Sequence, residues 1–328
     1  MPLRYLLRRA HVDIWRPTAG CRTGSLTGRR VGNASGNGSS TGSTMMPWKT
    51  RDRAISLATK RVYTFRGGGE DGRHGSDPGE RTQVVFLRHG MSTFNKLNIF
   101  TGWWDVPLTE QGRQEALEAG KLLAAAGFRF DVAHASVLKR AGSSLHQLLD
   151  GCDQPYIPVK TSWRLNERHY GALQGRNKAV LEEDMGNIVV EWRRAYDARP
   201  PPMTETHPHW PLISLDHRYR GVKVPESESL RDTAKRVMEY WESDIVPDLR
   251  AGKRVVVVAH ANTLRSLVKK LDDIDEAAIR NVNIPTGVPF VYDFDADLRP
   301  TGEPDKNGVR GRFVGEVVQG GGGGRDLP

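Results

Sequence analysis

The chain of 328 residues has only two cysteines, Cys21 and Cys152, and no long apolar run. Two cysteines exclude a disulfide framework and a zinc site built from cysteines alone. No stretch approaches the roughly 18 apolar residues that a membrane-spanning helix needs, which excludes integral membrane association through such helices. Coiled-coil and collagen repeats are also missing. The hydrophobic share of 38% is enough to fill one sizeable globular core or two small ones.

Basic charge is concentrated at the N-terminus. The whole chain has 48 Lys and Arg against 39 Asp and Glu, a formal net charge of +9. Residues 1–66 hold 13 of the basic and two of the acidic residues, so the remaining 35 basic and 37 acidic residues nearly cancel. Because the basic excess belongs to an arm without a nucleic-acid-binding motif, we expect no nucleic-acid partner.

Composition divides the chain into three parts. Gly, Ser, Thr and Asn dominate residues 17–45, and residues 67–80 are again rich in glycine. Such segments bury too little apolar surface to offset the entropy of the chain. We therefore predict a disordered basic extension over residues 1–81, a single globular domain over residues 82–315 and a disordered Gly-rich tail over residues 316–328.

The first 16 residues differ from the rest of the extension. Leucines recur there on one helical stripe, with arginines on the opposite face. An Arg-rich amphipathic start followed by Ser- and Gly-rich sequence is typical of a transit peptide, which would direct the protein to a mitochondrion or a plastid. Two alternatives stay open: a solvated tail on a cytoplasmic protein, and a true start at Met45 or Met46.

From residue 82 onward, short apolar runs alternate with helical patterns. The runs predict buried strands over residues 84–87, 130–136, 255–259 and 289–294. Helices are predicted over residues 138–149 and 263–271, and over a segment that begins at Thr109 as N-cap and stops at Gly127. This alternation predicts an α/β fold with a largely parallel sheet covered by helices on both faces.

Two histidines directly follow predicted strands. His89 lies in the tripeptide Arg88-His89-Gly90, and His260 follows residues 255–259. Because the carboxyl ends of parallel strands form the ligand crevice of such sheets, both imidazoles are expected at its mouth. An imidazole there can act as a nucleophile or as an acid and base. A lone histidine after a strand is more often a hydrogen-bonded structural residue, so the pair matters more than either member.

Arginines accompany these histidines. Arg140 follows a third predicted strand, Arg193 and Arg194 form a pair, and Glu167 is one carboxylate among basic residues. Arginine matches phosphate oxygens with two parallel hydrogen bonds and keeps its charge at every working pH. Several arginines converging on two histidines and one glutamate indicate a site for a phosphate ester.

Longer motifs make a family resemblance specific. In order, they resemble those of the cofactor-dependent phosphoglycerate mutases, part of the wider histidine phosphatase superfamily. The resemblance covers about residues 82–300 and implies a three-layer fold with a mostly parallel central sheet flanked by helices. The matching segments are RHGMSTFN (88–95), FTGWWD (100–105), SVLKRA (136–141), LNERHYGALQG (165–175), NK (177–178), WRR (192–194), ESL (228–230) and IPTGVP (284–289).

The resemblance also implies roles. His89 would become a phosphohistidine, and Glu167 would shuttle the proton of the substrate hydroxyl. Groups around the transferring phosphoryl would be Arg88, Arg140, His260, Asn95, Ala261 and Asn262. The substrate carboxylate and second phosphate would be held by Ser92, Thr101, Gly102, Arg168, Tyr170, Lys178, Arg193 and Arg194.

The activity that the resemblance implies is that of an isomerase in glycolysis and gluconeogenesis. It interconverts 3-phosphoglycerate and 2-phosphoglycerate, is primed by 2,3-bisphosphoglycerate and uses no metal. Family members are often homodimers or tetramers. A bisphosphoglycerate synthase or a phosphatase with the same phosphohistidine is the enzymatic alternative, although the synthase branch carries glycine at the position of Ser92. A weakly active binding protein is the alternative from another class.

Four departures from the family pattern affect the prediction. Met91 replaces a glutamate, and Ala261 replaces a glycine, where a methyl group is harmless only if φ stays negative. Small residues at 142–144 are expected to weaken the start and packing of the helix that carries Arg140. Beyond Gly315 the usual C-terminal segment is replaced, and without a closing segment water competes with the acceptor.

Overall fold

The computed structural model describes residues 82–315. The predicted extension over residues 1–81 and the tail over residues 316–328 therefore lie outside the described residues. Within the described range, no helix has the length and apolar composition needed to cross a bilayer.

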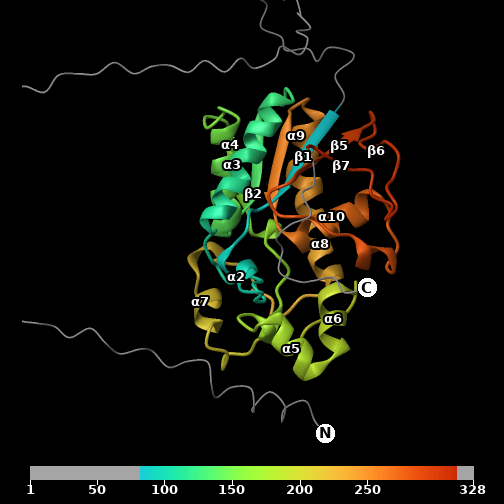
Figure 1. Ribbon diagram of the computed structural model, residues 1–328. Coiled ribbons are helices and arrows are strands. Elements are labelled where there is room, and N and C mark those ends of the chain that lie inside the picture. Colours follow the sequence, from blue (N-terminus) through green and yellow to red (C-terminus); the bar gives the residue numbers. More distant parts are fainter. Residues whose placement is uncertain (1–81, 316–328) are drawn as a thin grey trace, which may run out of the picture. The chain divides into compact units, whose positions relative to one another are not determined.

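One sheet forms the centre of this part of the chain (Figure 1). Its main order is β3-β2-β4-β1-β5-β6, with β7 paired to β5. β1, β2, β3 and β4 are mutually parallel, whereas β5 runs antiparallel to β1. The strands are β1 (Thr82–Arg88), β2 (Val132–Ser136), β3 (Val159–Ser162), β4 (Val255–Ala259), β5 (Pro289–Phe294), β6 (Pro300–Thr301) and β7 (Arg312–Phe313).

The direction of β5 follows from where the chain re-enters the sheet. Pro289, the first residue of β5, pairs with Leu87 near the end of β1. The preceding loop is held at the same edge, since the Arg88 side chain donates to the Ile284 carbonyl. A strand that begins beside the end of its neighbour must run the opposite way, and proline is tolerated at its first position.

Helices cover both faces of the sheet, which confirms the predicted α/β fold with a mostly parallel sheet (Figure 1). Because side chains alternate along a strand, Val257 of β4 faces one core and Val258 the other. One face packs against α3 (Glu110–Ala125) and α4 (Lys139–Gly151). The other packs against α8 (Leu230–Tyr240), a π-turn (Trp241–Ile245), α9 (Val246–Arg250) and α10 (Ala261–Leu271).

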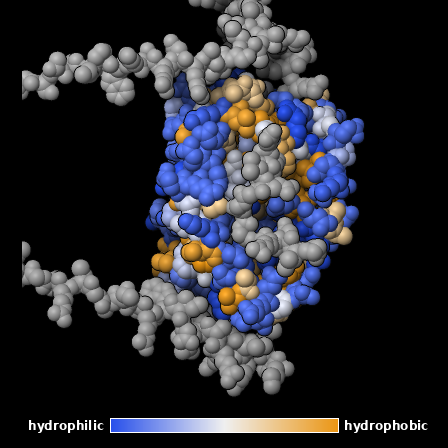
Figure 2. All heavy atoms as spheres, in the orientation of Figure 1, coloured by the Kyte–Doolittle hydropathy of each residue, from blue (hydrophilic) through white to orange (hydrophobic). Residues whose placement is uncertain are grey.

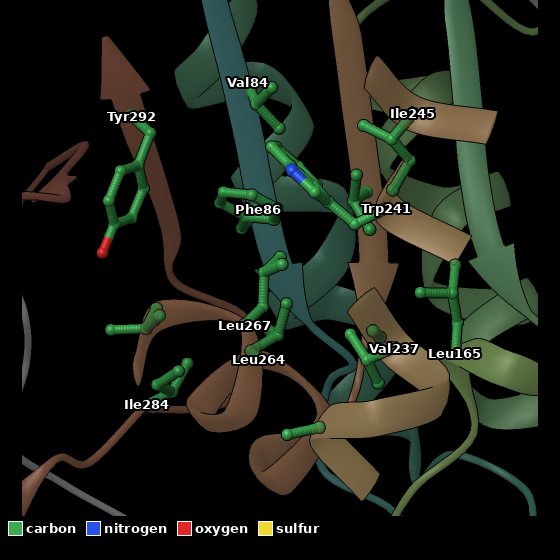
Figure 3. Close-up of a cluster of buried hydrophobic side chains, with 14 of the residues drawn as sticks. Val84, Phe86, Leu165, Val237, Trp241, Ile245, Leu264, Leu267, Ile284 and Tyr292 are labelled. Atoms are coloured by element: carbon green, nitrogen blue, oxygen red, sulfur yellow. The ribbon is translucent and has the colours of Figure 1, made fainter. Parts of the chain in front are cut away.

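The core beneath α8 and α10 is rich in aromatic rings (Figure 3). Phe86 of β1 lies 5.7 Å, centroid to centroid, from Tyr292 of β5 in an edge-to-face arrangement. It also lies 6.3 Å from Trp241. Such pairs add about 0.5–1.5 kcal/mol each to the stabilisation from burial. This packing fixes β1, whose last residue, Arg88, directly precedes His89.

The opposite layer depends on two glycines. A Cβ atom added at Gly120 of α3 would lie 2.1 Å from the Leu148 carbonyl oxygen of α4. One added at Gly151 of α4 would lie 2.3 Å from the Leu117 carbonyl oxygen of α3. The two backbones therefore approach too closely for any side chain. The outward faces of the pair are hydrophilic, as Figure 2 shows for the visible side.

The remaining elements lie at the end of the sheet where β1 finishes (Figure 1). They are α2 (Thr93–Lys96), η1 (Trp163–Leu165), η2 (Gly171–Leu173), α5 (Lys178–Met185), α6 (Asn187–Arg194), α7 (Trp210–Ser214), η3 (His217–Tyr219) and η5 (Ala278–Asn281). The 35 residues between α6 and α8, numbered 195–229, are called the α6–α8 connection below. These segments form the surroundings of the site.

Most predicted element bounds agree with the structure to within a few residues. The helix capped by Thr109 is confirmed, since its side chain accepts a hydrogen bond from the Gly112 amide. α10 begins at Ala261, two residues before the predicted start, and His260 is its N-cap residue. β3 was not predicted, because its residues are mostly exposed and carry no apolar pattern.

Candidate active site

The two histidines predicted at strand ends lie together. The backbone N–H of His89 donates to the Ala259 carbonyl oxygen at 3.0 Å, which ties the residue after β1 to the end of β4. The imidazole of His89 lies 4.9 Å, centroid to centroid, from that of His260, with 64° between the ring planes. Both rings are buried. The rings therefore meet edge to face at the carboxyl edge of the sheet.

The hydrogen bonds of His89 fix its tautomer. Nδ1 lies 2.7 Å from the Gly90 carbonyl oxygen, which can only accept, so Nδ1 carries the proton. Nε2 accepts a 3.3 Å hydrogen bond from Nε of Arg140 and therefore holds the lone pair. Burial lowers the pKa of His89 well below its ordinary value, and the charges of Arg140 and Arg88 lower it further. The ring is thus a neutral base with Nε2 as its nucleophilic atom.

Arg140 is held by backbone oxygens on the opposite side. Its two terminal nitrogens donate to the carbonyls of Trp104 at 2.9 Å and Gly102 at 2.8 Å. Gly102 has φ of +54°, and a Cβ there would lie 1.8 Å from Oε1 of Gln174, so only glycine fits. Burial lowers the pKa of Arg140 to about 10, which leaves it cationic at neutral pH. Arg140 is therefore a fixed positive charge aimed at Nε2 of His89.

Several buried polar atoms near His89 have no partner within residues 82–315. They include Nε of Arg88 and both ring nitrogens of His260. Burial lowers the pKa of His260 well below its ordinary value, and the charge of Arg140 adds to the effect. Buried polar atoms are rarely left unsatisfied, and when several converge they indicate a polar ligand.

Glu167 joins this group through the backbone. Its Oε1 accepts hydrogen bonds from the amides of Arg168 at 2.8 Å and Asn262 at 3.2 Å. The side chain is buried, and no donor within residues 82–315 hydrogen-bonds Oε2. Asn262 lies in the first turn of α10, directly after His260 and Ala261. The carboxylate is therefore oriented from the helix that begins at the second histidine.

A second set of cationic groups surrounds Tyr170. Its hydroxyl accepts a 2.9 Å hydrogen bond from the side-chain amide of Asn262. The guanidinium carbon of Arg168 lies 4.6 Å from the centre of its ring, and Nε and Nη1 of Arg168 are buried without a partner. Burial, the largest single influence, raises the pKa of Tyr170, but Arg168 and Lys178 together outweigh it, and the net shift is downward. Burial lowers the pKa of Lys178 nearby to about 8.

The description "Histidine phosphatase superfamily (branch 1)" belongs to the family model that matches residues 84–298. The chain belongs to this superfamily. The motif resemblance is thereby confirmed at the level of the superfamily, and the chain is an enzyme of this superfamily. Its two strand-end histidines with Arg88, Arg140 and Glu167 form the candidate active site.

Solved structures show the same fold. Bacillus stearothermophilus YhfR is similar with a TM-score of 0.52 and 22% identity, over 67% of this chain and 94% of that protein. Mycobacterial glucosyl-3-phosphoglycerate phosphatase Rv2419c has a TM-score of 0.51 and 23% identity, over 71% and 97%. Mycobacterial hydrolase 1 has a TM-score of 0.50 and 22% identity, over 71% and 96%. At these identities the likeness concerns the fold alone.

The predicted residues on α6 lie at its C-terminal end. The side chain of Arg193 donates to Glu182 of α5 at 3.2 Å, while its carbonyl accepts from Arg168 at 2.8 Å. Arg194 lies close enough to Arg88 that its charge lowers the pKa of Arg88, for which burial is the larger cause. The arginine pair is therefore part of the cationic surroundings of the site.

Three other predicted residues have local structural contacts. Ser92 and Asn95 form a capping box at the start of α2, with Ser92 Oγ donating to Asn95 Oδ1 at 2.8 Å. Thr101 is buried next to Gly102, and its hydroxyl makes a long 3.5 Å contact with the Ile99 carbonyl. The capping box holds the loop after Gly90, and it uses Oδ1 of Asn95 but not the Nδ2 donors that a phosphoryl oxygen would need.

The structure resolves three of the departures. Ala261 is the first residue of α10 and does not have positive φ, so its methyl group is accommodated. α4 forms a continuous helix from Lys139 to Gly151 despite the small residues at 142–144. Ser144 is buried there and its hydroxyl accepts a 3.0 Å hydrogen bond from the Gly90 amide.

At the third departure, the amide of Met91 donates to Oε2 of Glu115 on α3 at 2.8 Å. Sequence reasoning missed both supports of the catalytic loop, Ser144 and Glu115.

A buried ion pair beneath Glu167 was also missed. Arg236 of α8 donates to both carboxylate oxygens of Glu228, at 2.7 and 2.9 Å. It also donates to the Glu167 carbonyl at 3.0 Å, and Glu228 accepts from the His169 amide at 2.8 Å. The only signal in the sequence was the spacing of Glu228 and Arg236, eight residues apart at the start of a helix. Within residues 82–315, no group of three or more His, Cys, Asp or Glu side chains is arranged so that it could bind a metal ion.

Proposed function

We propose that the chain is a phosphoglycerate mutase that interconverts 3-phosphoglycerate and 2-phosphoglycerate through a phosphohistidine on His89. One observation carries the proposal: a nucleophilic imidazole faces unsatisfied cationic donors, and a second cationic cluster lies around Tyr170. A substrate with two anionic ends matches two such clusters. Arg168, Lys178 and the α6 arginines would hold the end that does not react.

The first half-reaction uses the lone pair of Nε2. Nε2 attacks phosphorus, and the bond between phosphorus and the donor oxygen breaks. The charges of Arg88 and Arg140 balance the negative charge on the phosphoryl oxygens, and the neutral ring of His260 would donate a hydrogen bond to one of them. The Gly90 carbonyl stabilises the positive charge that develops on the ring, since it accepts from Nδ1.

Glu167 handles the proton. In its protonated form it gives the proton to the departing oxygen, and as a carboxylate it takes a proton from the attacking hydroxyl in the second half-reaction. Its fixed Oε1 leaves Oε2 for this exchange. The donor and acceptor hydroxyls belong to adjacent carbons, so a small shift of the bound acid exchanges them.

The primer fits the same residues. An orphaned Nε on Arg88 and two orphaned nitrogens on Arg168 offer partners to the oxygens of 2,3-bisphosphoglycerate. This compound would supply the first phosphoryl group. No metal ion has a part in the proposed transfer.

Hydrolysis is the second candidate function. It is favoured by the similar structure named as glucosyl-3-phosphoglycerate phosphatase, which shares the fold. A phosphatase would use the same phosphohistidine, with water as acceptor and Glu167 as its base. Synthesis of the bisphosphate is disfavoured by Ser92, for the reason given above.

Phosphorus NMR separates these reactions. 3-Phosphoglycerate is incubated with the full-length protein, with and without a catalytic amount of 2,3-bisphosphoglycerate. The proposal expects 2-phosphoglycerate to form, faster with primer, and inorganic phosphate to appear far more slowly. Phosphate as the main product would replace the mutase with a phosphatase. If neither product forms and 2,3-bisphosphoglycerate leaves no acid-labile label on His89, a binding protein replaces both.

A further inference from the structure

The α6–α8 connection packs on the loop that holds Arg140. Its Met203, Ile213 and Tyr219 form a buried cluster with Trp103. The Tyr219 ring lies 4.8 Å, centroid to centroid, from that of Trp103. The same loop, residues 102–105, supplies both carbonyls to which Arg140 donates. A change in the connection is therefore expected to reach Arg140 through this loop.

Arg218 makes the polar link between the two. Within the connection it donates to both oxygens of Asp216. It reaches out of the connection to Oδ2 of Asp105 at 2.7 Å and to the Val137 carbonyl at 3.0 Å. Its side chain is 24% exposed and that of Asp105 18%, so this ion pair is partly shielded from water. Arg218 is bidentate only toward Asp216, whereas its contact with Asp105 is one charged hydrogen bond, which partial shielding makes stronger than an exposed pair.

Asp105 connects Arg218 to the start of α4, because its carboxylate contacts both. Its Oδ1 accepts a 2.8 Å hydrogen bond from the amide of Lys139, the first residue of α4. The N-cap residue, Leu138, makes no side-chain cap of its own, so Asp105 does this from a distance. The next residue is Arg140. One carboxylate thus joins Arg218 to the first turn of the helix that carries the arginine facing His89.

A second contact of the connection is with Asn166, the residue that precedes Glu167. The hydroxyl of Tyr219, the neighbour of Arg218, accepts a 3.0 Å hydrogen bond from the side chain of Asn166. The amide oxygen of Asn166 accepts from Ser136 at 2.8 Å. Residues 218 and 219 therefore touch supports of both Arg140 and Glu167.

We infer that Arg218 is a positioning residue for phosphoryl transfer. Its ion pair with Asp105 holds the start of α4 in place, and this in turn holds the guanidinium of Arg140 against Nε2 of His89. The inference rests on the proposed role of His89 as the phosphoryl acceptor. Arg218 does not contact His89 or Arg140 and acts only through Asp105 and the loop over residues 102–105.

The test compares Arg218→Met, Arg218→Lys and Asp105→Asn. Arg199→Met is the matched control, since Arg199 lies in the same connection and pairs with Asp232 at 2.7 Å, away from that loop. Single-turnover labelling of His89 by 2,3-bisphosphoglycerate gives the rate. A displaced catalytic group costs on the order of 10-fold to 100-fold, which we expect for Arg218→Met and Asp105→Asn, with partial recovery in Arg218→Lys. Arg199→Met should match the wild type.

A second measurement distinguishes displacement of Arg140 from a general destabilisation of the protein. Burial is the main cause of the low pKa of His89, and the charges of Arg140 on α4 and Arg88 on β1 lower it further, while the ring of His260 after β4 faces it. Withdrawal of Arg140 alone should raise this pKa, which ¹⁵N NMR titration of the ligand-free imidazole measures. Arg218→Met and Asp105→Asn should titrate at higher pH than the wild type and Arg199→Met.

The outcomes are distinct. An unshifted His89 titration in Arg218→Met, or an equal loss of rate in Arg199→Met, would overturn the inference. A wild-type protein that 2,3-bisphosphoglycerate does not label at His89 would count against the proposed function. In that case the NMR titration still decides whether Arg218 positions Arg140.

Discussion

The floor and the rim of the candidate site are built differently. The floor consists of Arg88, His89, Arg140 and His260 at the strand ends, and the rim consists of Lys178, Arg193 and Arg194 on α5 and α6. Arg140 is 1% exposed and His260 0%. The side chains of Arg88, His89 and Arg140 donate to backbone carbonyls, which move only with the sheet or its loops.

The rim uses side-chain partners instead. The ion pair between Arg193 and Glu182 joins side chains that are 25% and 42% exposed. Such pairs contribute about 0–1 kcal/mol, and their geometry adapts easily. The difference suggests a division of labour: the floor fixes the reacting phosphoryl group, and the rim selects which anion carries it. The floor should therefore control the rate of transfer and the rim the affinity for substrate.

The largest effect is expected at the floor nucleophile. His89→Ala removes the atom that accepts the phosphoryl group, so turnover should fall by about 10⁴-fold or more. The measurement is acid-labile labelling together with steady-state turnover. His146→Ala is the control, because His146 is an exposed histidine on α4 with only a contact to its own helix. Label that survives in His89→Ala would place the nucleophile elsewhere.

The next effect tests how strictly the floor is fixed. Arg140→Lys keeps the charge but cannot donate to His89, Gly102 and Trp104 in one planar arrangement. We expect the single-turnover rate to fall by about 10²-fold or more, as when a preorganised donor is lost. Arg140→Met should fall further. A lysine variant near the wild-type rate would show that charge alone matters, and the contrast with the rim would disappear.

Much of the floor could be predicted because its signals are local. The runs at 255–259 and 289–294 are strands with those bounds, and each catalytic histidine directly follows a strand. The supports of the floor could not be predicted in this way. Asp105 and Arg218 are 113 residues apart, and the carbonyls that hold Arg140 carry no side-chain signal at all.

For two predicted residues the structure adds a contact that the motifs do not show. Ser92 and Asn95 fit the resemblance, yet their side chains pair with each other at the start of α2. A motif shows which residue types are present, but hydrogen-bond competition inside a short loop decides where they point. Likewise, the hydroxyl of Ser144 in the stretch of small residues at 142–144 accepts a hydrogen bond from the Gly90 amide, which no motif predicts.

A pH experiment sharpens the comparison at the rim. Because burial lowers the pKa of Lys178 to about 8, its charge is present below that pH and is lost as pH rises through it. Substrate binding by an ammonium should therefore weaken above about pH 8, seen as a fall in kcat/KM. Lys178→Arg remains charged and should lack this alkaline fall. Lys178→Met should raise KM about tenfold with a smaller change in kcat, since uniform binding is lost. Identical alkaline limbs in the wild type and Lys178→Arg would exclude Lys178 as the cause.

The smallest effect concerns the loop under the floor. Glu115→Gln keeps an oxygen that can accept from the Met91 amide, so unfolding free energy and turnover should change little. Glu115→Ala leaves that partly buried amide without its partner and should lower the unfolding free energy by about 1–3 kcal/mol. Urea titration measures both variants. If Glu115→Gln also lost turnover by tenfold, the charge rather than the hydrogen bond would matter, because that carboxylate also raises the pKa of Arg88, which burial lowers. The floor would then depend on long-range charge as well as on backbone anchoring.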